Sequence, residues 1–149
     1  MTQTVTVRNP VLRGMYPDPS WIWDGRRGEV VLVNSSFELV PGLPIHTSRD
    51  FAHWRHVSHA IDAAMAERLM LRYVKDSGGI YAPTLRLVHG RYVIVCTVAR
   101  LDENAALAGG VSPEELDRYR RSQGNFVLSC PSLEGPWDGP VLVAGPSVT

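Results

Sequence analysis

The sequence is poor in cysteine, and this scarcity excludes one large class of small proteins. Cys96 and Cys130 are the two cysteines among 149 residues, too few for a disulfide-rich secreted scaffold. They also lack the close paired spacing of a zinc site. We therefore expect two buried thiols in a protein of a reducing compartment, with a single disulfide as the alternative.

The sequence also lacks net charge and any long hydrophobic run. Fifteen basic residues balance fifteen acidic ones, so the chain has no electrostatic footprint for nucleic acid or an anionic membrane. No apolar stretch approaches the ~20 residues of a membrane span, and no basic segment leads into an apolar one near the first residue. These absences predict a cytoplasmic protein with a neutral substrate and without nucleic-acid or membrane partners.

Glycine and proline, by contrast, are frequent, with 13 and 11 residues. They separate short apolar runs, which predicts an all-β fold of short strands and tight turns. The expected strands form two sets of four, at 20–23, 29–36, 44–48 and 54–58, and at 82–88, 91–98, 124–130 and 141–144. Two sets of four consecutive strands are typical of two β-propeller blades.

Three segments depart from this strand pattern. Residues 60–73 are rich in alanine, leucine and methionine, which predicts a short packing helix. Ser112 can cap a helix, proline follows at its first position and Glu115 completes a capping box, so a helix is expected up to Ser122. Residues 1–7 alternate threonine with valine, as an edge strand or an irregular lead-in does.

A carboxylate between two prolines, Asp18, is the strongest candidate for a chemical role. Each proline fixes its own φ and pushes the residue before it toward extended geometry, so Tyr16 and Asp18 are expected to be extended and constrained. Such a carboxylate suits a general base, which must lie within hydrogen-bond reach of the proton it takes. A plain turn is the alternative, because proline, aspartate and serine all favour turns.

A series of short motifs runs along roughly the first hundred residues. In order they are NPVL (9–12), GMYPDPS (14–20), NSSFE (34–38), PGLPI (41–45), SRDF (48–51), Trp54 and SGGIYAPT (77–84). Taken together they resemble the amino-terminal part of a family 43 glycoside hydrolase, and they are most similar to its β-xylosidase branch. Weaker similarity follows at GNF (124–126) and GPW (135–137).

That resemblance implies a five-bladed β-propeller, of which residues 1–149 supply about the first two blades of a truncated catalytic domain. It implies hydrolysis of O-glycosidic bonds with inversion, and Asp18 matches the general base. The general acid and the aspartate that tunes its pKa have no match, so the chain alone is expected to be inactive. Glu134 lies in a superficial echo of the acid's motif, and we assign it to a surface turn instead.

The resemblance also places Phe37 and Tyr81 in the subsite for the terminal sugar. Tyr81 stands where the family usually has tryptophan, which keeps an apolar face and adds a hydroxyl. Core aromatics between the blades are the alternative for both residues. Trp21 and Trp23 alternate on one expected strand and share a face, and we expect that face to be core rather than a binding platform.

His53, His56 and His59 suggest a metal cluster at first sight. Histidines three residues apart lie on opposite faces of a strand, so no metal site is expected there. No cofactor is expected either, because nothing here supplies the oxygen ligands of the structural calcium that some complete propellers of the family hold. Three other aspartates lie in turn-like contexts and receive no catalytic role: Asp24, Asp50 and Asp62.

The leading hypothesis is an exo-acting β-xylosidase or α-L-arabinofuranosidase that acts on neutral xylo- or arabino-oligosaccharides. Two alternatives stay open. In a non-catalytic carbohydrate-binding or assembly protein, Asp18 would be structural; in a fructan- or sucrose-cleaving propeller, an aspartate near the amino terminus would be a nucleophile. Two blades also leave sheet faces and edges uncovered, which favours aggregation or association with a missing half, and a homo-oligomer is a further expectation.

Overall fold

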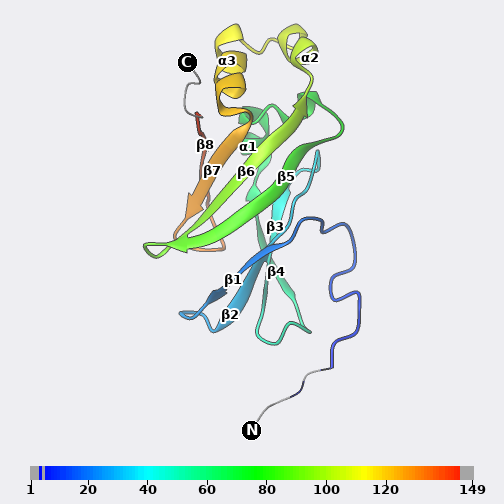
Figure 1. Ribbon diagram of the computed structural model, residues 1–149, viewed down its shortest axis with the longest axis vertical. Helices are drawn as coiled ribbons and strands as arrows, with labels where there is room; N and C mark the ends of the chain where they lie inside the picture. Colours follow the sequence, from blue (N-terminus) through cyan, green and yellow to red (C-terminus); the bar gives the residue numbers. More distant parts are fainter. Residues whose placement is uncertain (1–3, 5, 145–149) are drawn as a thin grey trace.

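Two four-stranded antiparallel sheets make up the chain in the computed structural model, which describes residue 4 and residues 6–144 (Figure 1). The first sheet has the order β1 (Ser20–Asp24), β2 (Glu29–Val33), β3 (Gly42–Ser48) and β4 (Arg55–Ile61). The second has the order β5 (Val74–Val88), β6 (Arg91–Leu101), β7 (Asn125–Cys130) and β8 (Asp138–Leu142). Consecutive strands are neighbours in both sheets, as in propeller blades.

These sheets confirm the predicted all-β fold with two sets of four strands. Several strand boundaries differ from expectation, most of all in β5, which begins at Val74 rather than at residue 82. Strand β2 ends at Val33 rather than residue 36, because the next residues turn away to bind the loop before β1. Strand β8 begins at Asp138, earlier than expected. The lead-in expected at residues 1–7 lies largely outside the described residues.

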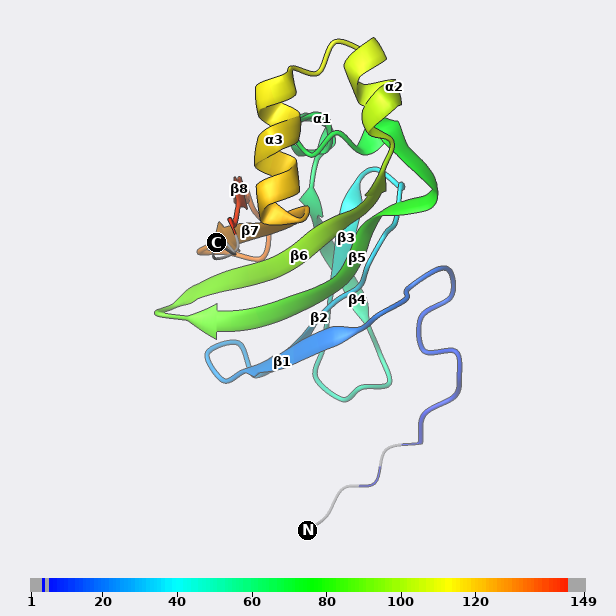
Figure 2. The same cartoon turned by 45° about the horizontal axis from the view of Figure 1, so that its top comes forward.

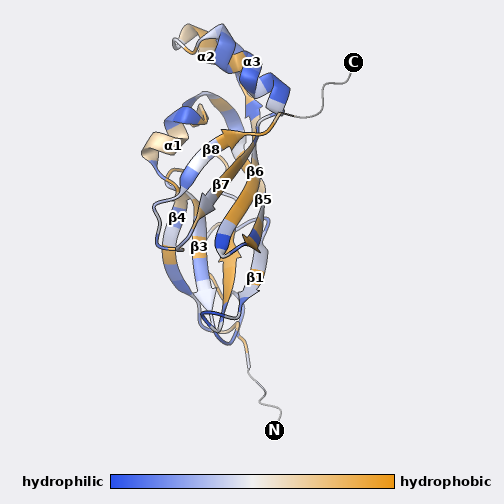
Figure 3. Ribbon diagram, turned by 90° about the vertical axis from the view of Figure 1, so that its left-hand side faces the viewer, coloured by the Kyte–Doolittle hydropathy of each residue, from blue (hydrophilic) through white to orange (hydrophobic). Residues whose placement is uncertain are grey.

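The two sheets lie face to face, with β5 against β1, β2 and β3 (Figure 3). Strand β6 shows the period-2 pattern that this packing requires, because Tyr92, Ile94, Cys96 and Val98 are buried at alternate positions. Burial of apolar surface from both sheets is the main stabilising contribution to such a fold. The largest fully buried side chains of this shared core are Leu43, Ile45, Ile61, Leu69, Ile80, Leu85, Tyr92, Ile94, Phe126, Leu128 and Leu133.

Trp21 and Trp23 correct one expectation. They share a face, as predicted, but that face is turned away from the second sheet, and the two residues are 56% and 57% exposed. Ile22 between them is the residue that packs against the shared core. The alternation of β1 was therefore read correctly, while its buried side was assigned the wrong way round, because residue size alone does not say which face another sheet covers.

A polar network links the two sheets at Asp24, the last residue of β1. The Asp24 carboxylate is fully buried and accepts hydrogen bonds from the Arg26 backbone N–H, from the Arg26 guanidinium and from the Tyr92 hydroxyl of β6. The same guanidinium donates to the Gly90 carbonyl at 3.0 Å. A buried carboxylate is costly unless it is paired in this way, so Asp24 has a structural role.

Four short helical segments lie at one end of the sheets (Figure 2): α1 (Ala63–Arg68), η1 (Leu71–Tyr73), α2 (Glu103–Ala108) and α3 (Pro113–Ser122). The capping box of Ser112 and Glu115 is present and α3 ends at Ser122, as predicted. The helix expected over 60–73 is shorter: α1 begins after Asp62, whose side chain caps it, and η1 completes the segment. Met70, Ala106 and Leu116 form a small second core beneath these helices.

Cys96 and Cys130 are both free and buried, which confirms the expectation of two buried thiols over the alternative of a disulfide. Burial raises the pKa of the Cys96 thiol to about 12. Within the described residues, no helix combines the length and the apolar character that crossing a membrane requires.

Candidate active site

The candidate active site centres on the loop before β1, where Asp18 is exposed to solvent. The segment that follows β2 holds this loop by four hydrogen bonds. Asn34 Nδ2 donates to the Tyr16 and Pro17 carbonyls at 2.8 and 3.1 Å, and the Ser35 backbone N–H donates to the Pro17 carbonyl at 3.1 Å. The Ser35 hydroxyl then donates to Asp18 Oδ2 at 2.7 Å. The carboxylate is therefore fixed in place by buried residues while it faces water.

The backbone of Asp18 differs from the extended conformation expected before a proline. Its φ is +48°, in the left-handed region, which aspartate tolerates better than most residues. Such a conformation costs of order 1–3 kcal/mol and persists only where surrounding contacts determine it. The hydrogen bonds from Asn34 and Ser35 supply those contacts. The predicted constraint on Asp18 is present, but tertiary bonds impose it together with the prolines.

Phe37 and Tyr81 meet beside this segment, although 44 positions separate them in the sequence. Their rings pack edge to face with centroids 5.3 Å apart, and both side chains are half-buried. A two-way backbone bridge between Phe37 and Ile80 brings them together, with N···O distances of 3.0 and 2.9 Å. Gly79 permits this close approach, because a Cβ there would lie 2.3 Å from the Phe37 carbonyl oxygen.

Asp18 and Tyr81 lie at the same end of the two sheets. The Cys96 thiol of β6 is within hydrogen-bond distance of the Tyr81 carbonyl oxygen, at 2.8 Å. Burial is the main cause of the raised pKa of Cys96, and the negative charge of Asp18 adds to it. The structure thus brings Asp18, Phe37 and Tyr81 into one region from three separate parts of the chain.

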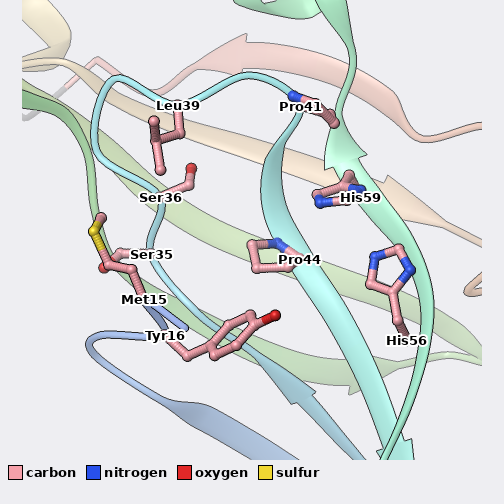
Figure 4. Close-up of a pocket in the computed structure, with 9 residues that line it drawn as sticks. All are labelled: Met15, Tyr16, Ser35, Ser36, Leu39, Pro41, Pro44, His56 and His59. Carbon is pink, nitrogen blue, oxygen red and sulfur yellow. The ribbon is translucent and has the colours of Figure 1, made fainter. Parts of the chain in front are cut away.

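A pocket of about 400 Å³ opens on the other side of Ser35 (Figure 4). Its lining includes Tyr16, Ser35, Pro44, His56 and His59, whereas Phe37 and Tyr81 do not line it. Ser35 therefore both lines the pocket and donates a hydrogen bond to the carboxylate of Asp18. The pocket lies on the side of the first sheet that faces away from the second sheet.

The histidines correct another expectation. His56 and His59 were expected on opposite faces of a strand, but both line the pocket and their ring centroids are 4.6 Å apart. The reason is a β-bulge in β4: Ile45 pairs with Ser58, whereas His46 pairs with His56, so one extra residue is inserted between them. No sequence pattern in β4 indicated this bulge.

A third histidine, His46 of β3, lies beside His56 and His59. No sequence pattern singled it out. Its ring lies 5.2 Å from that of His56 and 5.0 Å from that of Tyr16, between centroids. The pKa of His46 is lowered to about 4, mainly by burial and in smaller part by the nearby imidazoles of His56 and His59. In the part of the chain that the structure describes, no group of three or more His, Cys, Asp or Glu side chains is placed to hold a metal ion.

The remaining acidic candidates have structural contacts. Asp50 accepts hydrogen bonds from the backbone of Ala52 and His53 and pairs with the His53 ring at 2.8 Å, which confirms its turn context. Glu134 lies in the turn closed by Gly135 N–H and the Ser132 carbonyl, as expected for a surface turn. Among the described residues, the side chains of Asp50 and Glu134 have no hydrogen bond or ion pair with the Asp18 loop.

Comparison with known families gives a match to the family described as Glycosyl hydrolases family 43 over residues 7–148. Among curated proteins, the chain is 36% identical over 138 residues to "Non-reducing end alpha-L-arabinofuranosidase BoGH43B" of Bacteroides ovatus, which covers 93% of this chain and 22% of that protein. It is 31% identical over 140 residues to "Xylan 1,3-beta-xylosidase" of Vibrio sp, which covers 94% of this chain and 23% of that protein. The chain thus spans less than a quarter of the length of these relatives.

Solved structures whose titles name GH43 are also similar to this chain. "Bacteroides ovatus Xyloglucan PUL GH43B" matches 93% of this chain and 23% of that chain, with a TM-score of 0.71 and 34% identity. The GH43 protein BlXynB from Bacillus licheniformis matches 95% of this chain and 25% of that chain, with a TM-score of 0.69 and 29% identity.

Proposed function

Because the chain belongs to glycosyl hydrolase family 43, we propose that residues 1–149 are the amino-terminal part of a catalytic domain that hydrolyses O-glycosidic bonds in xylo- or arabino-oligosaccharides. In this proposal the complete domain is a five-bladed β-propeller with an inverting mechanism. The relatives named for arabinofuranosidase and xylosidase activity support the substrate class. Family membership also favours this assignment over a fructan- or sucrose-cleaving enzyme.

The observation that carries the proposal is the fixed, solvent-facing carboxylate of Asp18. An inverting glycosidase needs a general base that holds a water molecule against one face of the sugar. Ser35 occupies Oδ2 of Asp18, while Oδ1 accepts no hydrogen bond from the described residues. That free oxygen is available to accept a proton from water. The hydrogen bonds of Asn34 and Ser35 hold the loop and its carboxylate in a fixed orientation.

Phe37 and Tyr81 are proposed to form the apolar wall of the terminal-sugar subsite. Edge-to-face packing fixes both rings, and an aromatic face suits the apolar C–H side of a sugar ring. The Tyr81 hydroxyl donates its proton to the Ser77 carbonyl at 2.5 Å, so toward a sugar it is available only as an acceptor. The same hydrogen bond holds the ring in place.

The general acid is proposed to lie outside these residues. An inverting pair requires two carboxyl groups ~6.5 to 9.5 Å apart, and the acid must carry a proton. Asp24 cannot serve, because it is fully buried; burial raises its pKa, but the hydrogen bonds from Arg26 and Tyr92 outweigh that effect and lower it to about 2. The 149-residue chain is therefore expected to be catalytically inactive.

The test uses both the chain and its longer reading frame. The chain alone should show no turnover of nitrophenyl β-xyloside or nitrophenyl α-arabinofuranoside. A protein that continues along the encoding DNA should turn over one of them, with inversion observed by NMR of the first-formed sugar. In that protein, Asp18→Asn should lower kcat by about 10²–10⁴-fold with little change in KM, because the base acts in the transition state.

Asp117→Asn is the matched control, since this exposed aspartate of α3 pairs with Arg121 on the helix surface. It should leave kcat unchanged. An Asp18→Asn enzyme as active as the wild type, or a product of retained configuration, would refute the assignment of Asp18 as base. Xylo-oligosaccharide binding by the chain that survives Asp18→Ala would instead favour the non-catalytic binding function.

A further inference from the structure

Ser35 is the one described residue that makes a hydrogen bond to the carboxylate of Asp18. Its hydroxyl lies 2.7 Å from Oδ2, and because an ionised carboxylate only accepts, the serine donates. Ser35 is fully buried, at 0% exposure. Its hydroxyl has no other hydrogen-bond partner among the described residues. No second acceptor therefore competes for the hydroxyl proton, and Ser35 is a fixed partner of Oδ2.

The neighbouring Asn34 acts on a different part of the same loop. Its buried amide group donates to the Tyr16 and Pro17 carbonyls at 2.8 and 3.1 Å. It makes no hydrogen bond to the carboxylate in the part of the chain that the structure describes. Asn34 therefore fixes the course of the backbone, whereas Ser35 restrains the rotation of the Asp18 carboxylate about its own side-chain bonds.

From this division of roles we infer that Ser35 is a positioning residue for the general base. This inference rests on the proposed function and adds to it the choice between the two oxygens of Asp18. With Oδ2 bound to Ser35, Oδ1 is the oxygen presented to a water molecule, and the carboxylate turns only by breaking a buried hydrogen bond. A base accelerates the reaction only while it is aligned with the proton it takes. Ser35 is itself buried, so it acts on the reaction through Asp18.

The hydrogen bond from Ser35 has a second consequence, because a bond donated to a carboxylate favours its ionised form. A base works only while it is ionised, so this bond extends activity toward lower pH. Among the described residues, no basic side chain forms an ion pair with Asp18. The Cys96 thiol interacts with the charge of Asp18, but its pKa is raised to about 12, mainly by burial, so it stays neutral in that pH range.

The experiment uses the longer protein that continues along the encoding DNA, with kcat and kcat/KM measured over a range of pH. Ser35→Ala should lower kcat by about 10- to 100-fold with little change in KM, because the carboxylate is then free to turn. It should also move the acidic limb of the kcat/KM profile to higher pH. Ser35→Cys fills the same site with a weaker donor and should give an intermediate loss of kcat.

Ser36→Ala is the matched control for Ser35→Ala. Ser36 is the next residue, is also buried, and accepts a hydrogen bond from the Leu43 backbone N–H at 3.1 Å. Its side chain makes no hydrogen bond to Asp18 among the described residues. Ser36→Ala should therefore leave kcat and the acidic limb of the profile as in the wild type.

The Asp18→Asn background separates positioning from a purely structural role. Because Ser35 acts through Asp18, adding Ser35→Ala to Asp18→Asn should lower kcat no further. A Ser35→Ala enzyme with the wild-type kcat and acidic limb, beside an inactive Asp18→Asn enzyme, would overturn the inference and leave the base assignment standing. Equal losses of kcat in Ser35→Ala and Ser36→Ala would overturn it too. A fully active Asp18→Asn enzyme would refute the base itself, and circular dichroism checks that every variant is folded.

Discussion

Tyr92→Phe tests whether the buried network around Asp24 holds the two sheets together. The change removes one hydroxyl from β6 and leaves the ring in the core. Asp24 is fully buried, so the lost hydrogen bond is not replaced by water. Hydrogen bonds to charged groups contribute about 1.5–3 kcal/mol, and we expect the free energy of unfolding to fall by this amount in urea titrations followed by tryptophan fluorescence.

The pH dependence of stability gives the same network an independent readout. Burial alone would raise the pKa of Asp24, but hydrogen bonds from Arg26 and Tyr92 lower it from 3.8 to about 2. Because the pKa of Asp24 is lower in the folded state, the ionised carboxylate stabilises the fold at pH values above its unfolded pKa. This stabilisation is lost as the pH falls through the folded pKa. The shift corresponds to about 2.4 kcal/mol, lost between about pH 4 and pH 2. In Tyr92→Phe, the free energy of unfolding should fall less over this pH range.

Tyr119→Phe is the matched control for Tyr92→Phe. The Tyr119 hydroxyl donates to the Val98 carbonyl at 2.8 Å, so its removal costs a neutral hydrogen bond of about 0.5–1.5 kcal/mol. The loss of stability at acidic pH should stay as in the wild type. Equal destabilisation by the two variants, with an unchanged pH profile in both, would refute the role assigned to Asp24.

Three further predictions concern other parts of the fold. Gly79→Ala should destabilise by about 3 kcal/mol in urea titrations, because its φ is +94° and its Cβ would meet the Phe37 carbonyl, whereas Gly28→Ala at φ +63° with open space should cost about 1 kcal/mol. His46 is buried with its pKa lowered from 6.5 to about 4, so stability should decline as pH falls between these values, and His46→Gln should remove that decline. Cys96, with its pKa raised to about 12 by burial, should react with a thiol reagent only at the rate of unfolding; fast labelling of the folded chain would contradict its placement.

Much of the architecture follows from the sequence alone. Short apolar runs between glycines and prolines predicted two sets of four strands, because such runs are long enough for one strand and too short for a helix. The capping box at Ser112 predicted the start of α3, since its hydrogen bonds are formed within one turn. The two prolines beside Asp18 predicted a constrained carboxylate, and the structure shows that constraint, although its backbone is left-handed rather than extended and its role as general base stays a prediction.

The tertiary structure decided what depends on distant partners. The left-handed conformation of Asp18 is held by Asn34 and Ser35, which are remote in sequence. The bulge in β4 places His56 and His59 on one face, and a bulge is set by pairing with β3 rather than by the strand's own residues. The exposed side of β1 depends on where the second sheet packs, so alternation fixed that Trp21 and Trp23 share a face, and only packing decided that it faces outward.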